Sequence, residues 1–174
     1  MVSILSSIFK KYWTIKDLMN IDQGRQTKSL SCKVSLVKTY HELKKETILE
    51  KFKKFFTRRK DVMNVYYIIF KFSVLSDSGN TSTIFIRTQP DYNNIEFLNN
   101  RVQIYCSCKD FMYRSAWVLD QHNSLFRSQK TDMALGTSIQ DAPKEKTKTS
   151  TLCKHSYAAL MYLANNYTSI MKSL

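Results

Sequence analysis

The segment "VYYIIFKFSVLSDSGNTSTIFIRT", residues 65–88, predicts a β-hairpin and decides the fold class. Residues 65–74 alternate two sets of side chains and are mostly β-branched or aromatic, which is typical of a strand. "SDSGN", residues 76–80, is a turn sequence in which Gly79 can adopt a positive φ, and the alternation resumes in "TSTIFIRT". These features predict two antiparallel strands joined by a short turn.

Weaker patterns on both sides extend the hairpin into a small sheet with helices. "NRVQIYCSC", residues 100–108, predicts a third strand, and "CKVSLVKTY", residues 32–40, predicts a short additional one. Apolar residues recur at helical spacing in residues 3–19, 41–57 and 110–122 and in the terminal segment 152–171. We therefore expect an α+β fold, in which a small antiparallel β-meander of three to four strands is combined with N-terminal helices and a C-terminal helix.

The chain has the size of one domain with appendages, at 174 residues. Residues 1–31 are predicted to form an N-terminal amphipathic helix followed by a polar linker over 20–31. Residues 32–174 are predicted to form a single domain with a long polar insert at about 123–151. The insert is rich in lysine, serine and threonine and has no sustained period, so we expect it either to contact a neighbouring molecule or to be a tolerated surface loop.

Positive charge dominates the composition, with 27 basic and 14 acidic residues and a net charge of +13. Residues 38–60 alone hold nine basic and three acidic side chains. This excess indicates attraction to nucleic acid, an anionic surface or an acidic protein without choosing among them. Phe55 and Phe56 lie within the segment, but core packing explains them better than base stacking. The candidate anion or nucleic-acid contacts are Lys44, Lys45, Lys51, Lys53, Lys54, Arg58 and Arg59.

Several function classes are disfavoured by what the chain lacks. No apolar run approaches the length of a membrane span, and Lys10 and Lys11 follow the first apolar stretch instead of preceding it, unlike a secretory signal. Carboxylates do not pair in an acid and base arrangement, and neither a nucleophile motif nor a glycine-rich phosphate loop is present. We expect an intracellular, non-enzymatic protein without a small-molecule substrate.

Three of the four cysteines form a metal-ligand pattern with one histidine. Cys106 and Cys108 are two residues apart on the predicted third strand, so both side chains should point to one face. Cys153 and His155 repeat the spacing where the last helix begins. Three thiolates and an imidazole suit one structural, tetrahedral Zn²⁺ that ties the strand to the helix. The alternative is that the thiols are buried as small apolar groups; a disulfide within Cys-x-Cys and redox chemistry are disfavoured.

Cys-x-Cys on a strand followed by Cys-x-His at a helix start resembles the SWIM-type zinc-binding domain. The wider context, "CSCKDFMYR" followed by a polar insert and "CKH", is similar to a long-insert variant found in structural proteins of large tailed bacteriophages. Lys109 stands where that variant commonly has proline. The resemblance implies a virion component, and the matching motif residues beyond the ligands are Asp110, Phe111, Tyr113 and Arg114.

Two of these motif residues have roles that can be predicted from their chemistry. The carboxylate of Asp110 could cap the helix that follows, by accepting hydrogen bonds from its first backbone N–H groups. Arg114 is the better placed of the nearby cations to donate to a ligand sulfur, whereas Lys109 and Lys154 are expected to be solvated surface charges.

Three functional interpretations follow. The first is a zinc-stabilised structural or assembly protein of a tailed-phage virion, present in the tail, baseplate or head–tail region and in the host cytoplasm, whose partners are other protein subunits. The second is a basic module that binds nucleic acid non-specifically. The third is a zinc enzyme, which ranks last because four protein ligands leave no position for water.

Overall fold

The computed structural model describes residues 12–43, 66–90, 97–127 and 151–174. The helices in this part of the chain are α2 (Ile15–Ile21), α3 (Gln26–Ser29), α5 (Ala116–Gln121) and α6 (Lys154–Lys172). The strands are β1 (Lys33–Leu43), β2 (Tyr66–Leu75), β3 (Thr81–Thr88) and β4 (Val102–Cys106). Short 3₁₀ turns occupy Gln23–Arg25 and Phe97–Asn99, and a π-helical segment, Phe111–Ser115, leads into α5. None of the helices among these residues is long and apolar enough to cross a membrane.

The four strands form one antiparallel sheet in sequence order, β1-β2-β3-β4. The predicted hairpin is present: Leu75 pairs with Thr81 across a turn in which Gly79 has a φ of 79°. The next pairing places Ile84 of β3 beside Cys106 of β4. The predicted meander and the α+β class are therefore confirmed.

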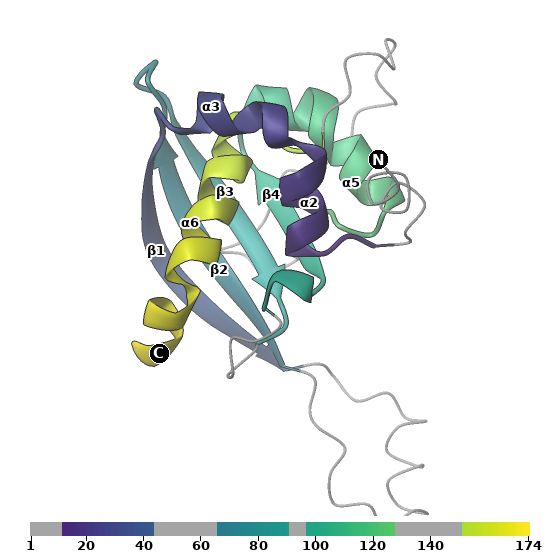
Figure 1. Ribbon diagram of the computed structural model, residues 1–174, viewed down its shortest axis with the longest axis vertical. Coiled ribbons are helices and arrows are strands. Elements are labelled where there is room, and N and C mark those ends of the chain that lie inside the picture. Colours follow the sequence, from purple (N-terminus) through teal and green to yellow (C-terminus); the bar gives the residue numbers. More distant parts are fainter. Residues whose placement is uncertain (1–11, 44–65, 91–96, 128–150) are drawn as a thin grey trace, which may run out of the picture.

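Helix α6 lies across one face of the sheet (Figure 1). Side chains at even positions of β2 point to this face because strand residues alternate. Phe70 and Phe72 are fully buried there, and their rings meet Tyr167 and Tyr162 of α6 at centroid distances of 6.5 and 6.0 Å. One part of the core thus lies between α6 and the sheet. The opposite face of the sheet is called the outer face below, and Phe85 and Tyr105 are buried there against Phe126 and Phe111.

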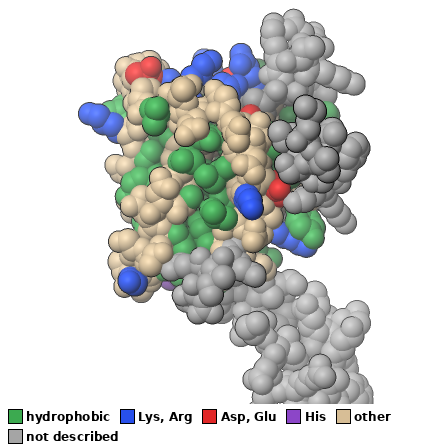
Figure 2. All heavy atoms as spheres, viewed as in Figure 1, with side chains coloured by type: hydrophobic (Ala, Val, Ile, Leu, Met, Phe, Trp, Pro, Cys, Tyr) green, Lys and Arg blue, Asp and Glu red, His purple; other side chains and the backbone are tan. Residues whose placement is uncertain are grey.

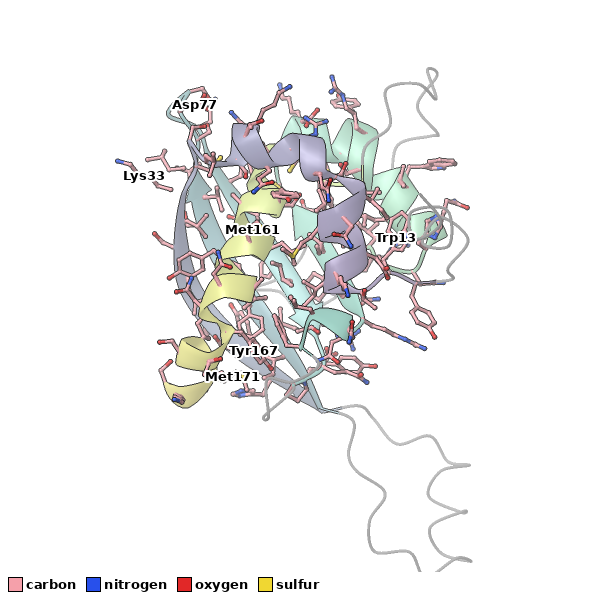
Figure 3. All side chains as sticks on the ribbon, in the orientation of Figure 1. Trp13, Lys33, Asp77, Met161, Tyr167 and Met171 are labelled. Carbon is pink, nitrogen blue, oxygen red and sulfur yellow. The ribbon has the colours of Figure 1, made fainter. Side chains whose placement is uncertain are left out.

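Hydrophobic side chains also remain visible on the α6 side of the molecule, around α6 and the neighbouring strand (Figure 2). Figure 3 labels Met161, Tyr167 and Met171 along the helix. Of these, Tyr167 is buried, whereas Met161 and Met171 are partly exposed. The partly buried apolar residues on α6 and on the α6 side of β1 are Val34, Leu36, Met161, Tyr162 and Met171.

The N-terminal helix is shorter than predicted among the described residues. Helix α2 begins at Ile15, because Thr14 and Asp17 form a reciprocal capping box that ends the preceding extended segment. Trp13 is buried against the core and stacks on His122 at 3.8 Å, and Thr14 makes an isolated bridge to Arg101. Residues 3–11 of the predicted helix lie outside the described residues.

The segment predicted as a polar linker, residues 20–31, contains short helices. This segment completes α2 and then forms the 3₁₀ turn and α3, which packs beside α6. Its polar composition hid these turns because they are too short to show a hydrophobic period. The described part of the N-terminal region therefore shares one core with the rest of the chain.

The helix predicted over 41–57 does not begin at residue 41. Strand β1 continues to Leu43, pairing Tyr40 with Ile69 and Glu42 with Tyr67. A register shift between Leu36 and Lys38 interrupts the alternation, which made the strand look shorter in the sequence. Residues 44–65 lie outside the described part.

The predicted insert begins later than residue 123. Ser124, Leu125 and Phe126 are buried beside β4. Ile104 donates its backbone N–H to Ser124 O at 2.8 Å, and Phe126 donates to Ile104 O at 3.0 Å. These residues satisfy the backbone of the last strand, so they belong to the core; residues 128–150 lie outside the described part.

Candidate metal centre

Cys106, Cys108, Cys153 and His155 come together at the junction of β4 and α6. Their four possible ligand atoms all lie within 4.8 Å of one another, so these residues are close enough to bind a metal ion. Cys106, Cys153 and His155 are buried, and Cys108 is half-buried. In a tetrahedral zinc site with Zn–S bonds of about 2.3 Å, neighbouring ligand atoms are roughly 3.5 to 3.8 Å apart, so only small side-chain movements separate this arrangement from coordination.

Cys108 reaches the cluster through a turn and not through the strand alternation that was predicted. Strand β4 ends at Cys106, and Ser107 stays bound to β3 through its N–H to Thr83 O at 3.0 Å. The chain then enters helical turns directly after Cys108. The thiol Sγ of Cys108 accepts the backbone N–H of Phe111 at 3.3 Å.

The second ligand pair is positioned by the first turn of α6. Cys153 is the N-cap residue, and its Sγ accepts the backbone N–H of Ser156 at 3.4 Å. In return, the Oγ of Ser156 accepts the backbone N–H of Cys153 at 3.1 Å. Bonds of this kind orient a ligand and stabilise its thiolate form. The sequence analysis missed Ser156, although a serine three residues after a possible N-cap is a capping-box spacing.

Asp22 fixes the chain just before Cys153. Its Oδ2 accepts the hydroxyl of Thr151 and, at 2.5 Å, the backbone N–H of Leu152. Burial raises the pKa of the Asp22 carboxyl to about 6, although the hydrogen bond from Leu152 acts in the opposite direction. No sequence signal could have identified this contact, since its partners are separated by about 130 residues.

The thiols of Cys106 and Cys108 have strongly shifted pKa values. Hydrogen bonds donated by Cys106 and Cys153 lower the pKa of the Cys108 thiol to about 4. Burial is the main cause that raises the pKa of the Cys106 thiol well above its ordinary value, and its two thiol neighbours add to the effect. The Cys108 thiolate is thus favoured over that of Cys106, and a dication would be needed to stabilise several thiolates at this spacing.

His155 supplies an independent indication that a metal fits here. The residue is only 8% exposed. Both ring nitrogens are buried and have no hydrogen-bond partner within the described part of the chain. Leaving a buried polar group unsatisfied costs about 1 to 3 kcal/mol, and a metal ion would satisfy one of the two nitrogens. The donor set therefore fits a metal chemically as well as geometrically.

Asp110 and Arg114 contact each other and do not act as predicted. Asp110 makes no side-chain cap; its carboxylate pairs with Arg114 Nε at 3.1 Å, so Arg114 is directed to Asp110 and not to sulfur. Tyr113 is 54% exposed. Phe111 is fully buried and meets the edge of Tyr105 at 5.8 Å, so its role is packing.

Lys154 is not a simple solvated charge. Its Nζ contacts Asp77 Oδ1 at 2.6 Å, which joins the start of α6 to the β2–β3 turn. This ion pair holds the pKa of the exposed Asp77 carboxyl below its ordinary value. Cys32 is partly buried, and desolvation raises the pKa of its thiol. Cys32 is not a member of the four-residue cluster.

The predicted anion contacts cannot be placed, because Lys44, Lys45, Lys51, Lys53, Lys54, Arg58 and Arg59 lie outside the described residues. Comparison of the chain with protein-family models, with curated proteins and with solved structures found no match.

Proposed function

We propose that this chain is a non-enzymatic structural or assembly protein stabilised by one Zn²⁺ ion. The observation that carries the proposal is the complete, largely buried set of four ligands from two separate parts of the chain. Four protein donors fill a tetrahedral site, so no position is left for a reacting water or substrate. The ion instead joins the end of β4 to the start of α6.

The proposed metal is zinc because of the ligand types. Three sulfur donors and one imidazole are soft to borderline ligands, which favour Zn²⁺ over magnesium or calcium. Backbone donors at two helix starts, Phe111 and Ser156, direct hydrogen bonds to Cys108 and Cys153. These bonds support the thiolate state that zinc requires.

We further propose that the site is of the SWIM type and that the protein is a subunit of a tailed-phage virion. The support is the motif itself: Cys-x-Cys, the residues Asp110–Arg114, and Cys-Lys-His after a long insert. The resemblance covers the metal-binding part of the chain. Its placement in the host cytoplasm before assembly belongs to the same proposal.

A surface suited to a neighbouring subunit lies on the α6 side. Apolar side chains gather there around the helix (Figure 2). Val34 and Leu36 of β1 and Met161 of α6 are only partly buried. Strand β1 also forms one edge of the described sheet, with Val37 56% exposed at its register shift. A partly exposed apolar face beside a sheet edge favours a protein partner.

Two experiments test the assembly role. Purified native particles should contain this chain in a fixed ratio to other virion proteins by mass spectrometry, and its absence from the particle would refute a virion role. Replacing residues 128–148 with a short Gly/Ser linker should leave zinc content and folding nearly unchanged and reduce incorporation. Normal incorporation would show that the insert does not contact the neighbour.

A further inference from the structure

A pocket of about 370 Å³ lies at the end of β4 opposite the metal centre. Arg101 directly precedes β4, and it alternates with Gln103 and Tyr105 of that strand; Gln103 pairs with Arg87 of β3. These positions belong to the outer face, away from α6. The lining residues are Tyr12, Tyr67, Arg87, Arg101, Val102, Gln103 and Asn123. This pocket is separate from the proposed zinc site and from the proposed assembly surface.

Each arginine of the pocket lies over a tyrosine ring. The Cζ of Arg87 is 3.8 Å from the centre of the Tyr67 ring, and the Cζ of Arg101 is 3.2 Å from the centre of the Tyr12 ring. A guanidinium held on a ring keeps its in-plane N–H groups directed outward, where they can bind phosphate oxygens. Its second flat face can also stack on a base.

The two arginines differ in how firmly they are already bound. Arg87 donates from Nε to Glu42 at 2.8 Å and from Nη1 to Gln103 at 2.7 Å, and Gln103 in turn donates to the Asn123 carbonyl at 3.3 Å. This network orients Arg87 and offsets its charge. Arg101 is exposed, and none of the carboxylates in the described ranges forms an ion pair with it. Arg101 is therefore the cation that is available to a ligand.

The surroundings fit a nucleotide better than a simple anion. The volume lies at the lower end of the range of roughly 300 to 1,000 Å³ for ligand pockets. Tyr12 is 36% exposed and supplies an aromatic edge beside Arg101. The amide nitrogen of Gln103 carries a second N–H besides the one that bonds the Asn123 carbonyl, and this N–H can pair with a base edge. On the same outer face, Lys71 and Lys38 lie over the rings of Phe85 and Tyr40, which extends the positive charge across the sheet.

We propose that this pocket binds one nucleotide of a single-stranded nucleic acid. Arg101 contacts the phosphate, and the base stacks against the Tyr12–Arg101 pair. Arg87, held by Glu42 and Gln103, forms the fixed wall of the pocket. The lysines of the outer face and the net charge of +13 attract the neighbouring phosphates of the strand.

The test is fluorescence anisotropy of the full chain with a labelled oligothymidylate of about 20 nucleotides, a length that exceeds the site size of one small domain. Arg101→Gln should weaken binding about tenfold or more, and Tyr12→Ala should weaken it similarly. Lys28→Gln, at an exposed position on α3, is the charge-matched control and should change affinity less than twofold. In the Arg101→Gln variant, the slope of log affinity against log salt concentration should also be shallower by about 0.7.

Zinc content and far-UV circular dichroism confirm that each variant is folded. Equal affinities of Arg101→Gln and Lys28→Gln would overturn the proposal. If duplex DNA bound as tightly as the single strand, the proposed base stacking would be wrong. If polyglutamate competed as well as unlabelled oligothymidylate, the choice of nucleic acid as the ligand would be wrong. Full displacement of the oligonucleotide by thymidine monophosphate at micromolar concentration would show that the ligand is a free nucleotide and not a strand. None of these outcomes bears on the zinc-dependent assembly role.

Discussion

Cys108 shows how a single residue reaches a metal centre by a route that its spacing does not reveal. It was predicted to face the same way as Cys106 on a strand, but the strand ends at Cys106 and the chain turns into a helix. The turn gives Cys108 a hydrogen bond from the N–H of Phe111, which a strand position would not supply. The same two-residue spacing therefore brings the Cys108 sulfur close to the Cys106 sulfur and also stabilises the Cys108 thiolate.

Loss of one ligand should remove the metal. Cys153→Ser is expected to reduce zinc content from about one equivalent to near zero, because serine replaces the buried thiolate with a poor zinc ligand. Since metal binding is coupled to folding, stability should fall by about 3 to 5 kcal/mol, or about 10 °C in Tm. Elemental analysis and thermal unfolding measure the two effects.

Cys32→Ser is the matched control for that experiment. Cys32 is the one cysteine outside the four-residue cluster, and it is partly buried near the start of β1. Its replacement should leave about one zinc equivalent in place, as expected for a residue that is not a ligand. Equal zinc loss in both variants, or full retention in Cys153→Ser, would contradict the assigned ligand set.

Asp22 should make stability depend on pH. Burial raises the pKa of its carboxyl to about 6 from a reference of 3.8, so the folded state binds this proton more tightly than the unfolded state. Its contribution is therefore largest at low pH and is lost as pH rises through about 6. Between pH 5 and 7.5 the loss should be about 1 to 1.5 kcal/mol.

Asp22→Asn isolates this effect, because asparagine does not titrate. The pH dependence of zinc binding is present in both proteins and cancels in the comparison. Denaturant unfolding at the two pH values gives the stability difference between wild type and variant. The free energy of unfolding of the wild type, relative to that of the variant, should be lower at the higher pH. A constant difference would show that the hydrogen bonds from Thr151 and Leu152 already keep the carboxylate ionised in the folded protein.

At the scale of elements, α6 combines two stabilising roles. Its first turn carries Cys153 and His155, and its later turns pack aromatic rings on the sheet. The ring of Tyr167 stacks on that of Phe97 at a centroid distance of 3.6 Å and meets the edge of Phe70. Tyr167 is labelled on the helix in Figure 3. A metal ion bound at the cluster would therefore hold one end of a helix whose middle is already held by apolar burial.

The β2–β3 turn gives an element-scale prediction. Gly79 has a φ of 79°, and a Cβ added there meets nothing within 4 Å, so Gly79→Ala tests backbone strain without a steric clash. We expect a loss of about 1 kcal/mol. Chemical denaturation should detect it.

Gly24→Ala is the control for the turn variant. Gly24 lies in a 3₁₀ turn without a positive φ, and a Cβ also meets nothing there within 4 Å. The variant should be neutral or more stable by up to about 1 kcal/mol, because alanine restricts the unfolded chain. A loss of the same size at both positions would contradict the assignment of strain to Gly79.

At the scale of the whole molecule, the candidate metal centre and the outer-face pocket occupy opposite ends of β4. Cys106 pairs with Ile84, whereas Gln103 pairs with Arg87 towards the other end of the same two strands. The two sites share no residue. Substitutions in one should thus have effects that add to those in the other.

Chelation should loosen one part of the molecule more than another. Removing zinc with a strong chelator should lower Tm and speed hydrogen exchange in β4 and the first turn of α6, because the ion joins these two elements. Exchange in the middle of the β2–β3 hairpin should change less. Mass spectrometry of exchanged peptides measures both regions, and uniform acceleration would show that zinc supports the entire fold cooperatively.

The sequence by itself determined the hairpin, the meander, the C-terminal helix and the four clustered ligands, because each depends on local alternation, turn chemistry or paired spacing. Only the tertiary structure decided how far β1 extends, that residues 124–126 complete the core, and that Asp22 and the Tyr12–Arg101 pair lie at the two sites. The physical reason is that these features arise from partners distant in the chain or from short turns without a hydrophobic period. A local pattern carries no information about either.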